Sequence, residues 1–156
     1  MAGIAHLAFG FAAKPLKPKV PLAVWLVGSE LIDIVYLATA LIGLNDLSHT
    51  LVVSAAWSLA FGIILGAVYR DWKTGLLGFG VVISHWILDA IVWPMIYVFP
   101  DRPNAIMTFL PGNPAGIGLG LYRHPAAVYA TEFGLTLAGA AVYVIFTVRR
   151  RRAKKA

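Results

Sequence analysis

The sequence has few charged residues and no cysteine. Of its 156 residues, only 13% are charged and 60% are hydrophobic, whereas a typical soluble domain carries about 25% charged residues. This low charge excludes an ordinary soluble domain and indicates an integral membrane protein. The absence of cysteine excludes disulfides and thiolate metal sites.

Lysine and arginine are absent from the long apolar runs of the chain. Each run has at least the ~20 residues that an α-helix needs to cross a bilayer. They predict four full transmembrane helices, at residues 21–44, 48–69, 74–99 and 125–148. Within these spans, Ser48 is expected to cap a helix N-terminus, Gly62 and Gly66 to allow close helix packing, and Pro94 to introduce a kink.

A further apolar segment, residues 2–13, is too short to cross a ~30 Å hydrocarbon core. It predicts a short re-entrant or half-inserted helix at the N-terminus. The predicted fold class is therefore all-α, a polytopic membrane helical bundle. Residues 1–148 are expected to form a single domain, followed by a basic tail at 149–156.

The basic residues are distributed unequally between the predicted loops. Eleven of the 13 lysines and arginines fall on one side of the predicted membrane, and only Arg102 and Arg123 fall on the other. Because positively charged loops remain in the cytoplasm, the C-terminus is expected to be cytoplasmic. The net charge of +6 thus indicates contact of the tail with anionic membrane lipid and no nucleic-acid partner.

Four of the seven acidic residues lie inside the apolar runs: Glu30, Asp33, Asp89 and Glu132. A carboxylate in hydrocarbon costs several kcal/mol unless it is paired, protonated or bound to a metal. No basic side chain is available there, so the expected partners are a metal cation, shared protons or histidines. These acids are therefore candidates for a functional site.

Spacing places the acids beside each other and beside histidine. Glu30 and Asp33 are three residues apart, and His85 and Asp89 are four apart, so each pair shares a helical face. Mixed nitrogen and oxygen donors suit zinc, with manganese or iron as alternatives, better than calcium. The predicted ligands to this divalent metal ion are His6, Asp33, His49, His85 and Asp89, with one metal or two left open.

Several segments resemble one family of small bacterial inner-membrane proteins. They are GIAHLAFGFAAKPLKPKVPLAVWLVGSELIDIVY, LSHTL, SHWILD and GIGLGLY, with Glu132 about ten residues further on. The family is named membrane-bound metal-dependent hydrolases and is related to the LexA-binding, inner membrane-associated hydrolases. The resemblance covers the chain from His6 to Glu132.

The resemblance implies a multi-pass protein of the bacterial inner (cytoplasmic) membrane. It also implies metal-dependent hydrolysis. A bound metal would supply a hydroxide nucleophile from its water, with Glu30 or Glu132 as the catalytic general base, and the depth of the site in the membrane indicates a lipid or lipid-linked ester or phosphoester as the substrate. Its motifs fall on His6 (Gly-x-x-His), Asp33, His49 (Ser-His-[Ser/Thr]), His85 and Asp89 (Ser-His-Trp-x-x-Asp), and Glu132. Where relatives carry His-Arg-Pro, this chain has Trp93-Pro94, so any role of that histidine is lost or altered.

Two other classes of function remain open from the residues alone. Carboxylates and histidines at mid-membrane also form proton relays and cation pathways, as in a proton- or cation-coupled transporter or channel. Alternatively, the protein is a non-catalytic membrane scaffold, in which hydrogen bonds between His85, Asp89 and their neighbours hold the helices together. The loop at residues 100–124 is a candidate lid for the hydrolase. The oligomeric state is left open.

Overall fold

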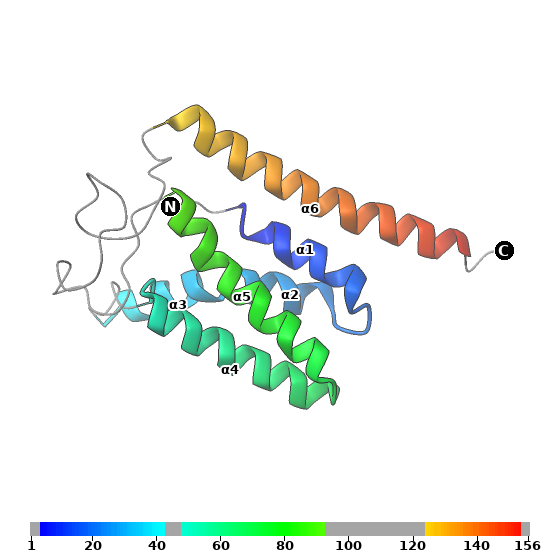
Figure 1. Ribbon diagram of the computed structural model, residues 1–156, viewed down its shortest axis with the longest axis horizontal. Coiled ribbons are helices and arrows are strands. Elements are labelled where there is room, and N and C mark those ends of the chain that lie inside the picture. Colours follow the sequence, from blue (N-terminus) through cyan, green and yellow to red (C-terminus); the bar gives the residue numbers. More distant parts are fainter. Residues whose placement is uncertain (1–3, 43–47, 93–123, 154–156) are drawn as a thin grey trace.

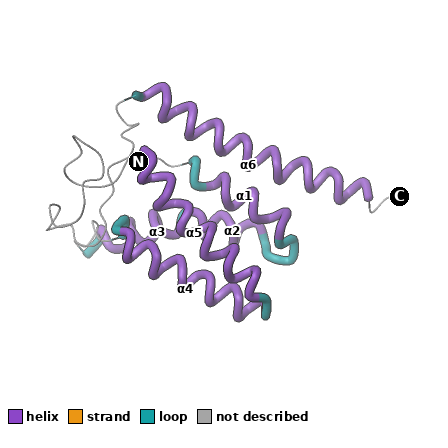
Figure 2. The backbone as a smooth tube through the Cα atoms, viewed as in Figure 1, coloured by secondary structure: helices purple, strands orange, loops and turns teal. Residues whose placement is uncertain are grey.

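The computed structural model describes residues 4–42, 48–92 and 124–153, and this part of the chain is entirely helical (Figures 1 and 2). It contains six helices and no strand among the described residues. The helices are α1 (Leu7–Leu16), α2 (Leu22–Ser29), α3 (Leu31–Ala40), α4 (Leu51–Tyr69), α5 (Trp72–Val92) and α6 (Pro125–Ala153).

Three of the described helices, α4, α5 and α6, are each long and apolar enough to cross a membrane. Helices α2 and α3 meet this criterion only together, as a pair bent by 56°. The chain thus has three membrane-crossing candidates, or four if the bent pair is counted as one. This is fewer than the four unbroken spans predicted from the sequence. Helix α1 has 10 residues and reaches only ~15 Å.

The prediction of an unbroken helix at residues 21–44 is wrong. Glu30 lies between α2 and α3 with φ −101° and ψ 4°, outside the helical region. At the preceding residue, the Ser29 carbonyl accepts a hydrogen bond from Nδ1 of His85 at 2.8 Å. Insertion of a side chain into the backbone ladder is a known cause of sharp helix bends. This break directs Glu30 and Asp33 toward α5.

The predicted N-cap at Ser48 is also wrong. Helix α4 begins at Leu51, and Thr50 is its cap, because Oγ1 of Thr50 accepts a hydrogen bond from the Val53 amide at 3.3 Å. The Ser48 hydroxyl instead bonds Nδ1 of His49 at 3.0 Å. Ser48 and Thr50 are both residue types that cap helices. The Ser48 hydroxyl, however, is hydrogen-bonded to the neighbouring His49 side chain.

Other helix ends differ from the prediction by a few residues. Helix α1 continues past residue 13 to Leu16, α5 begins at Trp72, and α6 continues to Ala153, so much of the predicted tail is helical. Pro94 and the remainder of the third predicted span lie outside the described residues.

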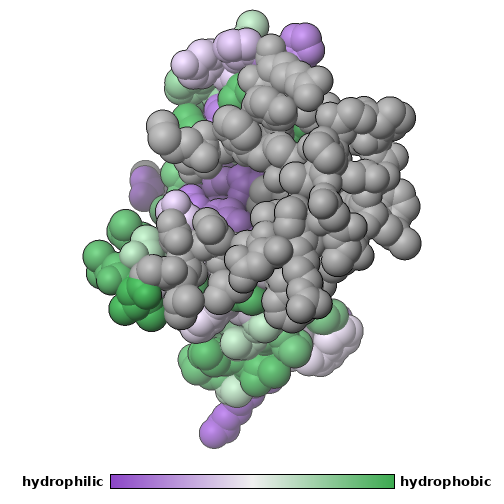
Figure 3. Space-filling view, turned by 90° about the vertical axis from the view of Figure 1, so that its left-hand side faces the viewer, coloured by the Kyte–Doolittle hydropathy of each residue, from purple (hydrophilic) through white to green (hydrophobic). Residues whose placement is uncertain are grey.

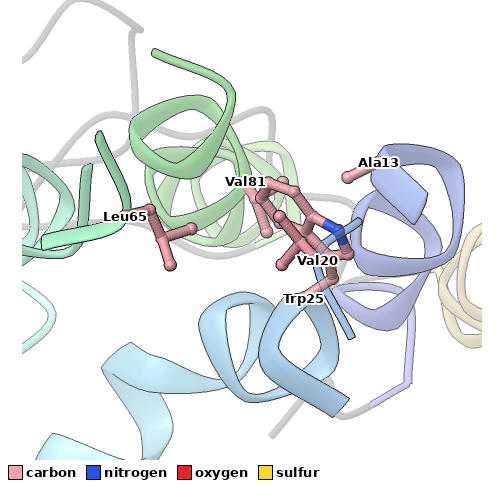
Figure 4. Packing of buried hydrophobic residues seen from close by; sticks show 5 residues of the cluster. All are labelled: Ala13, Val20, Trp25, Leu65 and Val81. Carbon is pink, nitrogen blue, oxygen red and sulfur yellow. The ribbon is translucent and has the colours of Figure 1, made fainter. Parts of the chain in front are cut away.

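Small residues let α4 and α5 pack closely, as predicted for Gly62 and Gly66. A Cβ atom added to Gly62 would lie 2.8 Å from the carbonyl oxygen of Gly75, and one on Gly66 would lie 3.5 Å from the Gly75 Cα. The close-packing motif is thereby confirmed. A buried apolar cluster then joins these helices to α1 and α2 through Ala13, Val20, Trp25, Leu65 and Val81 (Figure 4).

Helix α6 packs chiefly on α1, and the two helices approach closely at Gly139. A Cβ atom on Gly139 would overlap the backbone carbonyl of Ala8, whereas one on Gly134 would meet nothing within 4 Å. Most other residues of α6, such as Leu137 and Val144, leave their apolar side chains exposed. In the end-on view of Figure 3, hydrophobic residues lie at the left and lower edges, and a group of hydrophilic residues is seen near the centre. The exposed apolar surface fits contact with lipid.

We expect Gly139→Ala to lower the free energy of unfolding by about 1–3 kcal/mol, because the added methyl group forces α6 away from α1. Gly134→Ala is the matched control on the same helix, and it should be neutral or stabilising, because alanine favours helix over glycine. Unfolding of the two variants in detergent micelles measures both effects. Equal destabilisation by the two substitutions would contradict this packing.

The loop after α1, the α4–α5 turn and the C-terminal end of α6 lie at one end of the molecule (Figure 1). In the turn, Asp71 forms an ion pair with Lys17 and also accepts hydrogen bonds from the Lys73 amide and the Thr74 hydroxyl. These contacts, led by the Lys17 hydrogen bond, lower the Asp71 pKa from 3.8 to about 2. A depressed folded-state pKa gives stability that is present above the unfolded pKa and lost as the pH falls through the folded one.

Asp71→Asn should therefore remove a stability increment that the wild-type protein loses between pH 4 and pH 2. The difference between the unfolding midpoints of the two proteins should shrink steadily over that range. A difference that stays constant from pH 5 to pH 2 would show that the Asp71 charge contributes nothing.

Candidate metal centre

Five candidate ligands from separate parts of the chain meet inside the helical bundle. His6 precedes α1, Asp33 lies in the first turn of α3, His49 precedes α4, and His85 and Asp89 share one face of α5. His6, His85 and Asp89 are buried. Two groups have donor atoms close enough to hold a metal ion: His6 with His85 and Asp89, and Asp33 with His49 and His85.

Four donor atoms form a compact set: Nε2 of His49, Nε2 of His85, Oδ1 of Asp33 and Oδ2 of Asp89. From Asp33 Oδ1, the distances are 3.1 Å to His49 and 3.4 Å to His85. From Asp89 Oδ2, they are 3.6 Å to His49 and 3.3 Å to His85. Ligands held tetrahedrally at ~2.0–2.1 Å from zinc lie about 3.3 Å apart. The four nitrogen–oxygen distances are therefore close to four of the six edges of a tetrahedral site.

Hydrogen bonds orient both imidazoles of this set. Nδ1 of His85 lies 2.8 Å from the Ser29 carbonyl, and a carbonyl only accepts, so Nδ1 carries the proton. In the neutral ring this leaves the lone pair on Nε2, which faces the carboxylates. Nδ1 of His49 meets the Ser48 hydroxyl at 3.0 Å, and the His49 carbonyl accepts a hydrogen bond from Nε1 of Trp86 at 3.0 Å. Such contacts orient the ligands of metal sites.

Two polar atoms of this set are buried and lack a hydrogen-bond partner. Nε2 of His85 and Oδ2 of Asp89 are buried without a hydrogen-bond partner. A buried polar atom left unsatisfied costs about 1–3 kcal/mol. A cation between the two carboxylates and two imidazoles would satisfy these atoms, so the donor set fits a divalent metal ion.

His6 lies beside this set. Its ring stacks on the His85 ring with centroids 3.6 Å apart and planes within 6°. Its Nε2 lies 3.4 Å from Oδ1 of Asp89, whereas His49 and His85 approach Oδ2 of the same carboxylate. Both ring nitrogens of His6 are buried without a hydrogen-bond partner. His6 is thus available to a ligand, a water or a second face of the Asp89 carboxylate.

Glu30 faces the same cluster from the break between α2 and α3. Its Oε1 is buried and has no hydrogen-bond partner. The carboxylate interacts electrostatically with His6, His85, Asp33 and Asp89. Glu30 therefore borders the candidate site with a free carboxylate oxygen, which a general base requires.

Glu132, the other predicted catalytic acid, is engaged elsewhere. Its Oε2 accepts hydrogen bonds from the backbone amides of Ile4 at 3.0 Å and Ala5 at 2.9 Å. Nearby, the Thr136 hydroxyl donates to the Ile4 carbonyl at 2.7 Å. Glu132 thus holds the segment that leads directly into His6. We assign it to positioning that segment and no longer to proton transfer.

Some site residues were not predicted from the sequence. The Ser29 carbonyl and the Trp86 indole support the histidines, but nothing in the local sequence signals their contacts. Ser48 could have been recognised from its position next to His49. Trp93-Pro94 and the candidate lid at residues 100–124, apart from His124, lie outside the described residues. His124 precedes α6 and is exposed.

Neither the protein-family models, nor the curated proteins, nor the solved structures contain a match to this chain. The residues of this chain and their geometry therefore carry the assignment of the site.

Proposed function

We propose that this protein is a metal-dependent hydrolase embedded in a membrane. The observation that carries the proposal is the set of four donor atoms whose nitrogen–oxygen distances of 3.1–3.6 Å are close to the edges of a tetrahedral metal site. The free carboxylate oxygen of Glu30 beside that set adds a base, which a purely structural ion would not require. The resemblance to membrane-bound metal-dependent hydrolases supports the same reaction class.

In this proposal, Asp33, His49, His85 and Asp89 would hold one divalent ion, with zinc preferred over manganese or iron for these donors. Because these four donors fill a tetrahedral set, the ion would take up water as a fifth ligand, an expansion known for catalytic zinc sites. It would then supply an acidified water and polarise an ester or phosphoester oxygen. Glu30 accepts the proton of the attacking water. Nδ1 of His85 retains its proton and donates a hydrogen bond to the Ser29 carbonyl, which keeps the ring oriented.

The substrate class follows from where the site lies in the bundle. Asp33, His85 and Asp89 lie on helices that we assign to the membrane, His49 directly precedes α4, and α4 and α6 expose apolar side chains. A lipid or lipid-linked ester or phosphoester can reach such a site laterally. We further propose four crossings, with α2 and α3 as one bent crossing and α1 half-inserted. The basic end then faces the cytoplasm of a bacterium.

Hydrolysis of fluorescent diacylglycerol esters and phosphoesters in detergent micelles tests this proposal. We expect activity that a chelator abolishes and zinc restores. Glu30→Gln should lower kcat by at least about 100-fold while the protein still binds zinc. Glu132→Gln is the matched control and should retain both properties. Hydrolysis that survives Glu30→Gln and chelation would refute the proposal.

A proton- or cation-coupled transporter is the second candidate, and the break at Glu30 favours it. Discontinuous membrane helices are typical of transporter binding sites, and this break places a carboxylate beside Asp33 and the histidines. Proteoliposomes distinguish the two functions. A cation or proton flux that Asp33→Asn abolishes, in a protein without hydrolytic activity, would replace the hydrolase proposal.

A further inference from the structure

A cleft of about 330 Å³ lies between the end of α1 and the last turns of α6. Its lining includes Lys14 and Pro18 on one side and Tyr143, Phe146, Arg150 and Arg151 on the other. Lys14 lies eight residues after His6, about 12 Å away along the helix. The cleft is therefore separate from the candidate metal centre.

Positive charge dominates the lining. Lys14, Arg150 and Arg151 contribute three cations, and no acidic residue lines the cleft in the described part of the chain. The Lys14 ammonium donates to the carbonyls of Pro18 at 2.8 Å and Val20 at 2.7 Å. These two bonds fix the ammonium at the rim and leave its third N–H free. Fixed cations without carboxylate partners are suited to an anion.

The aromatic and the basic residues of the cleft lie at different depths along the axis of α6. Measured from Pro125 at 1.5 Å per residue, Tyr143 lies at ~27 Å, Phe146 at ~32 Å and Arg150 at ~38 Å. A hydrocarbon core is ~30 Å thick. With Pro125 at the opposite boundary, the two aromatic rings lie where the hydrocarbon ends, and the arginines lie at the level of the headgroups.

We propose that this cleft binds one anionic phospholipid. Its phosphate would contact Lys14, Arg150 and Arg151, while the first part of its acyl chains would pack on Tyr143 and Phe146. The position at the membrane boundary and the aromatic floor argue for a lipid over a free phosphate ion. This site requires only that the protein lies in a membrane, and it does not depend on the hydrolase activity.

Native mass spectrometry of the purified protein, titrated with phosphatidylglycerol, phosphatidylcholine or inorganic phosphate, tests the proposal. The double variant Arg150→Gln, Arg151→Gln should bind phosphatidylglycerol about 10- to 30-fold more weakly, since each basic residue near anionic lipid contributes about fivefold. The matched control, Arg149→Gln with Arg152→Gln, removes the same charge from the same turn of α6 outside the cleft. It should bind phosphatidylglycerol like the wild-type protein.

Three results would overturn the lipid site. Equal weakening in both double variants would mean diffuse surface attraction, and equal binding of phosphatidylcholine would mean no selection for negative charge. Displacement of phosphatidylglycerol by millimolar inorganic phosphate would assign the cleft to a soluble anion.

Discussion

His49→Ala should lower the affinity for Zn²⁺ by more than about 100-fold. Loss of a residue that only orients a ligand already costs 10- to 100-fold in metal affinity, and His49 contributes a donor atom of its own. Its Nε2 lies 3.1 Å from Asp33 and 3.6 Å from Asp89. Without it, the remaining three donors leave one position of the tetrahedral set open.

Competition with a zinc-binding dye at pH 7 measures this affinity. His124→Ala is the matched control, because His124 is exposed just before α6 and should bind no ion of the site. We expect zinc affinity to be unchanged in that variant. If His49→Ala and His124→Ala behave alike, the cluster is a network of His–Asp hydrogen bonds that serves only the fold.

Glu132→Ala should release the segment before α1. The amides of Ile4 and Ala5 would lose their common acceptor, and leaving the buried Ala5 amide unsatisfied costs about 1–3 kcal/mol. Glu132→Gln keeps a side-chain oxygen that can accept both bonds. The alanine variant should therefore open this segment at least about tenfold more often, since 1.4 kcal/mol corresponds to a factor of ten, and the glutamine variant should not.

The absence of native cysteine makes this opening measurable. Ala5 is 2% exposed, so Ala5→Cys should react slowly with a thiol reagent in the wild-type background and rapidly with Glu132→Ala. Ala13→Cys, equally buried at the other end of α1, is the control and should stay protected. Equal acceleration at both positions would mean that Glu132→Ala loosens the whole helix. In that case Glu132 is not a local anchor of His6.

The cluster could be predicted in large part because its residues are anomalous in their surroundings. Asp33, His85 and Asp89 are polar side chains within apolar runs. The i, i+4 spacing of His85 and Asp89 also places these two on one face of a helix. Helix type and approximate position follow from run length. The close approach at Gly62 follows from residue size.

What could not be predicted depends on contacts between distant parts of the chain. The break at Glu30 coincides with a bond between the Ser29 carbonyl and His85, which belong to different helices. Glu132 has the same sequence signature as the other buried acids, yet it caps backbone amides 127 and 128 residues earlier. Residue type and spacing do not show which distant groups a side chain contacts. The role of a buried carboxylate can therefore be assigned only once the fold is known.

The metal content of the purified protein tests the central claim most directly. Elemental analysis of protein purified without chelators should find about one zinc, manganese or iron ion per chain, as expected for a single tetrahedral set. The double variant His85→Ala, Asp89→Ala should contain none, with its helical circular dichroism unchanged. An absence of bound metal in both proteins, even after incubation with zinc, would contradict the account.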